Sequence, residues 1–193
     1  MNNSIKVMSD IEARPDARGI CTLFAIYILD QLYRKNKISF ATAQYTKHRR
    51  LLYLVWVAYA MCRPNNEIPT SSPMSAFKFY RYDAGPAPDF ELAEEDWIYT
   101  QVLRNPDLTS AYRFVNQSLS PVEMAHLNNA IKTVRKHFLR YDTYSLNAIT
   151  RDSMEMTRRI GCFQYLDMSP ANIRAECRAM STILNLDKNK KHR

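Results

Sequence analysis

The run from Arg49 to Cys62 constrains the fold of this chain more than any other stretch. Its last twelve residues, from Leu51 to Cys62, are all apolar, and its only charges lie in its first two residues. As a helix, those twelve residues would be about 18 Å long, and they are fewer than the roughly 20 residues that a membrane span requires. A helix that is apolar all round is covered on most sides. We therefore expect a central buried helix over about 49–62, with Trp56 in the core.

The length and composition suit one domain with a tail. The chain has 193 residues and only three glycines, which excludes Gly-rich phosphate loops and favours helices over a many-stranded sheet. Its four cysteines lie among apolar residues without a Cys-x-x-Cys pair, as expected of free thiols in a reducing compartment. The N-terminus lacks the apolar core of a signal peptide. The predicted location is therefore the cytoplasm.

Apolar residues at helical spacing predict several further helices. One begins near Asp16, after a flexible arm over 1–15, and one is expected over about 91–103. The clearest start is the Ser-Pro-Val-Glu sequence at 120–123, which combines an N-cap serine, proline at the first helical position and glutamate three residues after the serine. That helix should run to about Arg140, and two more are expected near 145–149 and after Ser169.

One segment reads as a strand. Residues 75–82 are rich in aromatics and lie between turn signals, and a short strand near Glu67 and Ile68 would supply the partner. Residues 83–88 read as a turn in which Gly85 provides backbone freedom. The expected fold is mainly α: a compact helical domain around the central helix, with a small β-ribbon near 67–82.

The sequence contains no catalytic or metal-binding pattern. His126 and His137 lie on one predicted helix but about 16 Å apart along its axis, so they cannot share a metal ion. Nucleophile elbows and His-Glu-x-x-His motifs are absent. The acidic residues 94–96 are better explained as a solvated helix N-terminus than as a carboxylate cluster. The residues therefore predict no metal or cofactor and give no support for an enzyme, although catalytic groups far apart in the sequence would leave no motif.

The charge is strongly positive, at +8, and permits a nucleic acid or an acidic protein partner. Basic residues gather on the polar side of the helix that starts at 121, and a solvated face explains them most simply. They are Lys132, Arg135, Lys136 and Arg140, followed by Arg151, Arg158 and Arg159. No helix-turn-helix or RNA-binding signature accompanies them.

Three blocks of the sequence follow one another in a recognisable order. The first block comprises residues 25–29, Ile38-Ser39 and Arg50-Leu51-Leu52-Tyr53, and the second is the aromatic strand ending in Tyr82, followed by Gly85-Pro86. The third runs from Leu119-Ser120 through Val134 to Tyr141, Leu146 and Thr150. In this order, the blocks resemble the Panacea family of SocA-like antitoxins and phage-associated proteins. The chain departs from the pattern at the inserted Asp83-Ala84 and at Arg151, where the family usually has histidine.

The resemblance implies a Panacea-like helical domain over 16–160, with residues 161–193 as an additional C-terminal helix and basic tail. It also implies a non-enzymatic protein that binds a protein toxin, or presents the toxin to a protease, in a bacterial or phage-infected bacterial cell. The candidate partner-binding residues are Tyr80, Arg81, Tyr82, Gly85, Pro86 and Arg151, expected at or near the surface, since Tyr and Arg are common interface anchors. The expected core and motif residues are Arg50, Leu51, Leu52, Tyr53, Trp56 and Thr150.

Two alternatives remain open from the sequence. The first is a phage-encoded inhibitor of a host defence complex, of the anti-CRISPR type, on the same scaffold. The second is a nucleic-acid-binding protein, which the net charge permits and no motif favours. No membrane association is predicted, and the sequence leaves the oligomeric state open.

Overall fold

The structure is a computed structural model that describes residues 17–33, 45–82, 85–89, 98, 102, 108–158 and 161–190. Its longer helices are α2 (Ala17–Tyr33), α3 (Tyr45–Met61), α5 (Thr109–Ser118), α6 (Pro121–His137) and α9 (Pro170–Lys190). Shorter elements are α7 (Thr143–Ala148), α8 (Glu155–Arg158), the 3-10 turns η3 (Pro64–Asn66) and η4 (Pro73–Ala76), and the π-helical turn η5 (Ile149–Ser153). Two strands, β1 (Phe79–Tyr82) and β2 (Gly85–Pro88), form one antiparallel ribbon, so the predicted mainly helical fold is confirmed.

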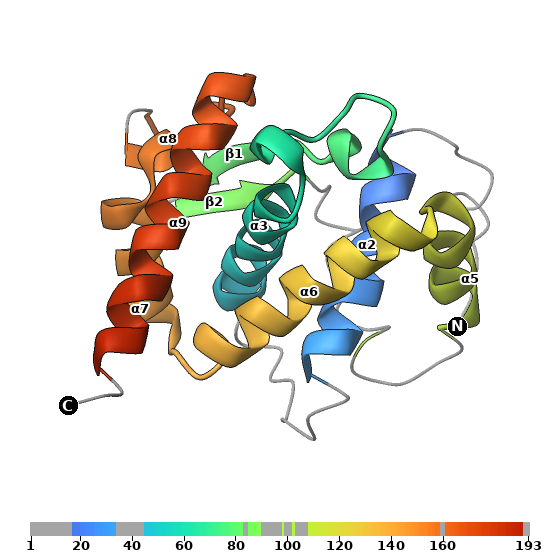
Figure 1. Ribbon diagram of the computed structural model, residues 1–193, viewed down its shortest axis with the longest axis horizontal. Helices are drawn as coiled ribbons and strands as arrows, with labels where there is room; N and C mark the ends of the chain where they lie inside the picture. Colours follow the sequence, from blue (N-terminus) through green and yellow to red (C-terminus); the bar gives the residue numbers. More distant parts are fainter. Residues whose placement is uncertain are drawn as a thin grey trace.

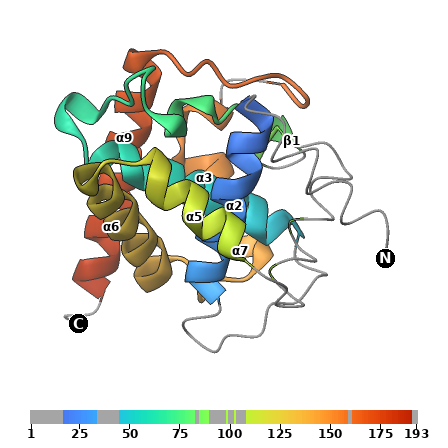
Figure 2. The same ribbon diagram turned by 90° about the vertical axis from the view of Figure 1, so that its right-hand side faces the viewer.

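Helix α3 is the centre of the fold, as its apolar sequence predicts. Every residue from Leu51 to Ala60 is at most 3% exposed. Figure 1 shows α3 between α9 on one side and α2 and α6 on the other, and in Figure 2 α2, α5 and α6 lie in front of it. A helix covered from so many directions has no polar side, which explains why this stretch is apolar all round.

The ribbon lies later in the chain than predicted. Residues 75–76 belong to η4, Glu67 and Ile68 are in neither a helix nor a strand, and β1 pairs with β2 instead, with Phe79 opposite Pro88 and Tyr82 opposite Gly85. The predicted turn over 83–88 was therefore wrong for residues 85–88. Proline is tolerated on an edge strand, where its missing N–H breaks no ladder, so Pro86 and Pro88 do not prevent pairing.

The other edge of β1 is covered by a distant segment, residues 163–166. The Arg81 N–H donates to the Gln164 carbonyl at 2.9 Å, and the Phe163 and Leu166 N–H groups donate to the carbonyls of Arg81 and Phe79 at 2.7 and 2.8 Å. The backbone groups on that edge of β1 are thereby satisfied, and a segment about 80 residues later in the chain becomes its neighbour.

Helix α6 begins as predicted. The Ser120 side chain accepts from the Glu123 N–H, and the Glu123 carboxylate accepts from the Ser120 N–H, which is the reciprocal capping box. The last helix, α9, shares the core through Ile173, Cys177 and Met180. All four cysteines are free, and Cys162 is exposed, contrary to its predicted apolar surroundings.

Some predictions lie outside the described residues. They concern the arm over 1–15, the start near Asp16, the restart at Ile38-Ser39, Asp83-Ala84, Arg159, most of the helix over 91–103 including the acidic residues 94–96, and the last three residues. Within the described helices, none is both long enough and apolar enough to cross a membrane.

Candidate interaction surface

A buried arginine fixes the ribbon to the helical core. Arg50 is fully buried on α3, and its Nε donates to Asn147 Oδ1 at 3.0 Å. Its two terminal nitrogens donate to the carbonyls of Pro86 and Tyr82 at 2.5 and 2.9 Å. A buried guanidinium is tolerated only with good acceptors. Because these acceptors lie on both strands and on α7, Arg50 holds the ribbon and α7 in position against α3.

Gly85 is needed for space and not for backbone freedom, so that prediction was wrong. The backbone of Gly85 does not have a positive φ. A Cβ atom at this position would lie 2.6 Å from Arg50 Nε and 2.8 Å from Thr150 Oγ1. Thr150 is itself buried and donates from Oγ1 to the Leu146 carbonyl at 2.8 Å. The motif residues Arg50, Gly85 and Thr150 therefore meet at one point inside the fold.

Gly85 and Pro86 were predicted at or near the surface, and the structure buries both. They lie against Arg50 and Thr150 because Arg50 holds β2 against the core. Because both residues are buried on β2, they affect the surface only by holding the neighbouring strand β1 in position. Tyr80, Arg81 and Tyr82 are half-buried. The six predicted core and motif residues, from Arg50 to Thr150, are at most 2% exposed.

Four aromatic side chains form a continuous cluster on and beside β1, called here the aromatic patch: Tyr80, Tyr82, Phe163 and Tyr165. The ring centroids lie 6.2 Å apart for Tyr80 and Tyr82, 6.2 Å for Tyr80 and Tyr165, and 6.0 Å for Tyr82 and Phe163. Phe163 is 71% exposed and Tyr165 is 59% exposed. The structure therefore joins two predicted residues to two that the sequence analysis missed.

Phe163 has an unfavourable backbone conformation. Its φ is 62°, in the left-handed region that a bulky side chain rarely adopts. Such strain costs on the order of 1–3 kcal/mol and is found mainly at functional sites. The ring nevertheless points to solvent and meets Tyr82 edge-on. Burial of Phe163 therefore does not explain the strained backbone.

The patch is supported by its polar neighbours. The guanidinium carbon of Arg49 lies 4.4 Å from the centre of the Tyr82 ring, a cation–π contact. The Tyr165 hydroxyl donates to Asp89 Oδ2 at 3.0 Å, which ties residue 165 to the residue after β2. These contacts hold two of the four rings in defined positions.

Arg151 does not join the patch through its side chain. It is exposed on η5 and forms two hydrogen bonds with Asp152, at 2.6 and 2.9 Å. The hydrogen bond from Arg151 lowers the pKa of the Asp152 carboxyl. Arg151 is thus part of a local surface ion pair.

A sequence signal for Phe163 and Tyr165 does exist. The Cys-Phe-Gln-Tyr-Leu sequence at 162–166 places two aromatics at spacing two, which is typical of a short strand. The segment is too short to stand out beside the helical patterns, and its partner strand lies far away in the sequence.

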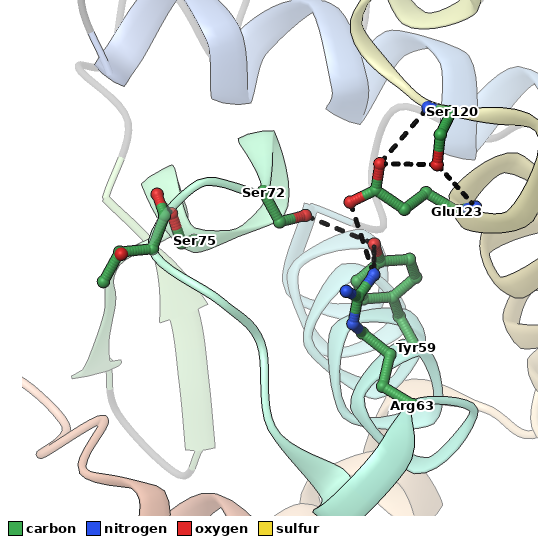
Figure 3. A network of polar contacts seen from close by, with 7 residues as sticks. Tyr59, Arg63, Ser72, Ser75, Ser120 and Glu123 are labelled. Atoms are coloured by element: carbon green, nitrogen blue, oxygen red, sulfur yellow. Dashed lines mark hydrogen bonds and ion pairs between the residues drawn. The ribbon is translucent and has the colours of Figure 1, made fainter.

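A cluster of polar side chains lies at the end of α3 and includes Tyr59, Arg63, Ser72 and Glu123 (Figure 3). Arg63 Nη1 donates to the Tyr59 hydroxyl at 2.9 Å and lies 3.3 Å from Glu123 Oε1, and Tyr59 is 3.2 Å from Ser72 Oγ. Partial burial alone would raise the pKa of Glu123, but hydrogen bonds from Ser120 and Ser72 and the charge of Arg63 lower it. Burial raises the pKa of Tyr59.

An ionised Glu123 with a lowered pKa is a weak base, and a tyrosine with a raised pKa is a weak nucleophile. The group therefore fits a structural joint between the end of α3 and the start of α6 better than a catalytic site. Among the residues that the structure describes, no three His, Cys, Asp or Glu side chains are grouped to hold a metal ion.

Comparison with known proteins identified no similar protein. No protein-family model matches the chain, and neither curated proteins nor solved structures gave a match. The resemblance to Panacea antitoxins therefore stays a prediction that rests on the three sequence blocks alone.

Proposed function

We propose that this chain is a non-enzymatic protein that binds another protein through the aromatic patch. The observation that carries the proposal is Phe163, a large aromatic side chain that is mostly exposed on a strained backbone and held edge-on against Tyr82. Tyrosine and arginine are enriched among the residues that dominate binding energy at interfaces, and large exposed apolar groups mark interaction sites when they gather.

The patch has the rigidity that binding requires. Aromatic side chains offer a large contact area with only two rotatable bonds, so little conformational entropy is lost when they are covered. Here the rings touch one another, and β1 is fixed to the core by the buried Arg50. A surface that is ordered before it binds avoids the cost of ordering on association.

The partner that the family resemblance suggests is a protein toxin, which the chain would neutralise or present to a protease. A host defence complex is the alternative protein partner, and the same patch would serve for it. The two hypotheses name different partners, but both use the aromatic patch as the binding surface.

The test is binding by variants of the patch. The chain is co-expressed with the product of its neighbouring gene, and Phe163→Gly is compared with Val122→Ser, which removes another apolar side chain that is 63% exposed on α6. We expect the parent and Val122→Ser to co-purify with the partner, and Phe163→Gly to bind at least about tenfold more weakly, since interface anchors commonly contribute 2 kcal/mol or more.

A neighbouring product that is not toxic and does not co-purify would refute the antitoxin reading. A pull-down from host lysate that recovers a defence component through the patch would then favour the inhibitor. Equal affinity of the parent and Phe163→Gly for a captured partner would refute binding through the aromatic patch.

Nucleic acid is the second candidate partner, favoured by the net charge of +8 and by exposed rings on which bases could stack. Such binding weakens steeply between low and physiological salt. A gel shift with a single-stranded oligonucleotide at low salt tests it, and the absence of any retardation would eliminate this candidate.

A further inference from the structure

An apolar groove of about 400 Å³ lies between the end of α6, α7, η5 and the second half of α9. Its larger lining side chains are Phe138, Tyr141, Tyr144, Ile149, Ile183 and Leu184. Tyr144 is 82% exposed, which is more than any other large hydrophobic residue described. The groove therefore presents an apolar floor with an aromatic ring at its open side.

The groove is separate from the aromatic patch. It is lined by residues 137–153 and by α9 near residues 183–184, whereas the patch lies on β1 and residues 163–165. In Figure 1 the ribbon lies near the upper part of α9 and α7 near its lower part. The two surfaces share no residue, so an inference about the groove stands independently of the proposed function.

The turn that borders the groove is an unusual element. Ile149 and Ser153 are the first and last residues of the π-helical turn η5, and both line the groove. Such turns are rare and occur frequently at functional sites. Thr150, inside the same turn, lies against the position of Gly85, so the shape of the groove wall is tied to the core.

Two exposed cations lie next to the groove lining: Lys136 directly precedes His137, and Arg140 directly precedes Tyr141. Two aspartates, Asp142 and Asp152, lie in the same part of the chain. Arg140 is exposed, and its guanidinium carbon lies 5.5 Å from the centre of the Tyr141 ring, at the edge of the groove. Both aspartates are engaged locally: Asp142 accepts from the Ser145 N–H at 2.7 Å, and Asp152 is bonded to Arg151. A partner that covers the groove meets an excess of positive charge.

We propose that this groove binds an amphipathic helix of another protein, with acidic residues along the polar side of that helix. Leucine-like side chains at spacings of three and four would enter the apolar floor, as in other helix-in-groove complexes. Carboxylates beside them would face Lys136 and Arg140, both exposed on and just after α6. Pockets for small ligands bury most of the ligand, whereas the exposure of Tyr144 shows an open site.

Nucleic acid fits the groove less well. Phe138, Ile149, Ile183 and Leu184 in its lining offer no hydrogen bonds to base edges.

The test uses a fluorescent peptide of about 16 residues, long enough to form a helix on the surface. It carries leucine at every third or fourth position and glutamate on the polar side. One control peptide replaces glutamate with lysine, and the other replaces leucine with glutamine. Binding to the full chain is measured by fluorescence anisotropy. We expect the acidic peptide to bind, and each control to bind at least about tenfold more weakly, because both charge and apolar contact contribute.

Variants of the chain locate the site. Tyr144→Ser should weaken binding of the acidic peptide about fivefold or more, and Arg140→Glu about tenfold. Both side chains are exposed, so the variants should melt near the parent temperature. Phe163→Gly, on the other surface, should bind the peptide like the parent.

Several results would overturn the proposal. Equal binding of the acidic and basic peptides would refute the preference for an acidic partner. Unchanged peptide affinity in Tyr144→Ser and Arg140→Glu would show that the peptide does not bind in the groove. Loss of binding in Phe163→Gly would place the peptide on the aromatic patch. Absence of binding up to millimolar peptide, or binding of single-stranded DNA that both groove variants abolish, would also refute it.

Discussion

Replacing Gly85 by alanine tests the central structural claim, that Arg50, Gly85 and Thr150 pack without spare room. The added Cβ would lie 2.6 Å from Arg50 Nε and 2.8 Å from Thr150 Oγ1. Neither neighbour can move easily, because Arg50 is held by three hydrogen bonds and Thr150 donates to the Leu146 carbonyl. One of them must nevertheless shift.

The expected cost follows from these contacts. Overpacking a buried site costs about 1–3 kcal/mol, and a lost hydrogen bond from a charged group costs about 1.5–3 kcal/mol. We therefore expect Gly85→Ala to lower the free energy of unfolding by about 3 kcal/mol. For a chain of this size, each kcal/mol moves the melting temperature by about 2–4 °C, so the midpoint should fall by about 6–12 °C.

The assay is thermal and urea unfolding followed by circular dichroism, with Gly161→Ala as the matched control. The nearest atom to a Cβ at Gly161 is 3.4 Å away, on the exposed side chain of Gln164. This control should change stability by no more than about 0.5 kcal/mol. A Gly85→Ala variant as stable as Gly161→Ala would refute the reasoning. The cost of Gly85→Ala should also shrink in an Arg50→Lys background, since residues in contact are not additive.

Three further predictions concern other parts of the chain. Phe163→Gly should be about 1 kcal/mol more stable to urea than Phe163→Ala, because only alanine retains the left-handed strain; the opposite order would contradict the strain. Burial, with a smaller contribution from Lys47, lowers the pKa of His48 to about 3. The contribution of His48 to stability should therefore be complete above pH 6.5 and fall by about 1.4 kcal/mol per pH unit from there toward pH 3, and urea titrations of His48→Phe should lack this slope. Trp56→Ala should cost about 3–5 kcal/mol in urea unfolding, since the indole is buried and donates to the Met74 carbonyl; a cost below 1 kcal/mol would contradict its core role.

The residues alone predicted four of the five longer helices, α2, α3, α6 and α9, but not α5 over Thr109–Ser118. The apolar run of α3 and the capping sequence of α6 act within one or two helical turns, so their signals are complete in short stretches. The buried position of Trp56 and of the Leu51-Leu52-Tyr53 motif follows from the same local pattern. The absence of a recognisable catalytic motif was likewise visible in the residues alone.

Tertiary structure decided the pairing of the ribbon, the packing of Arg50 against Gly85 and Thr150, and both surfaces. The strand partner of β1 could not be read from Pro86 and Pro88, because proline signals a turn until the strand is known to lie at an edge. Gly85 was expected to provide backbone freedom in a turn, and its role in leaving space follows only from the positions of Arg50 and Thr150. Tyr80 and Phe163 belong to one patch, and Tyr144 and Leu184 to one groove, only because the chain returns to the same place after many residues. Contacts at such separations depend on the packing of the whole core, which local periodicity does not encode.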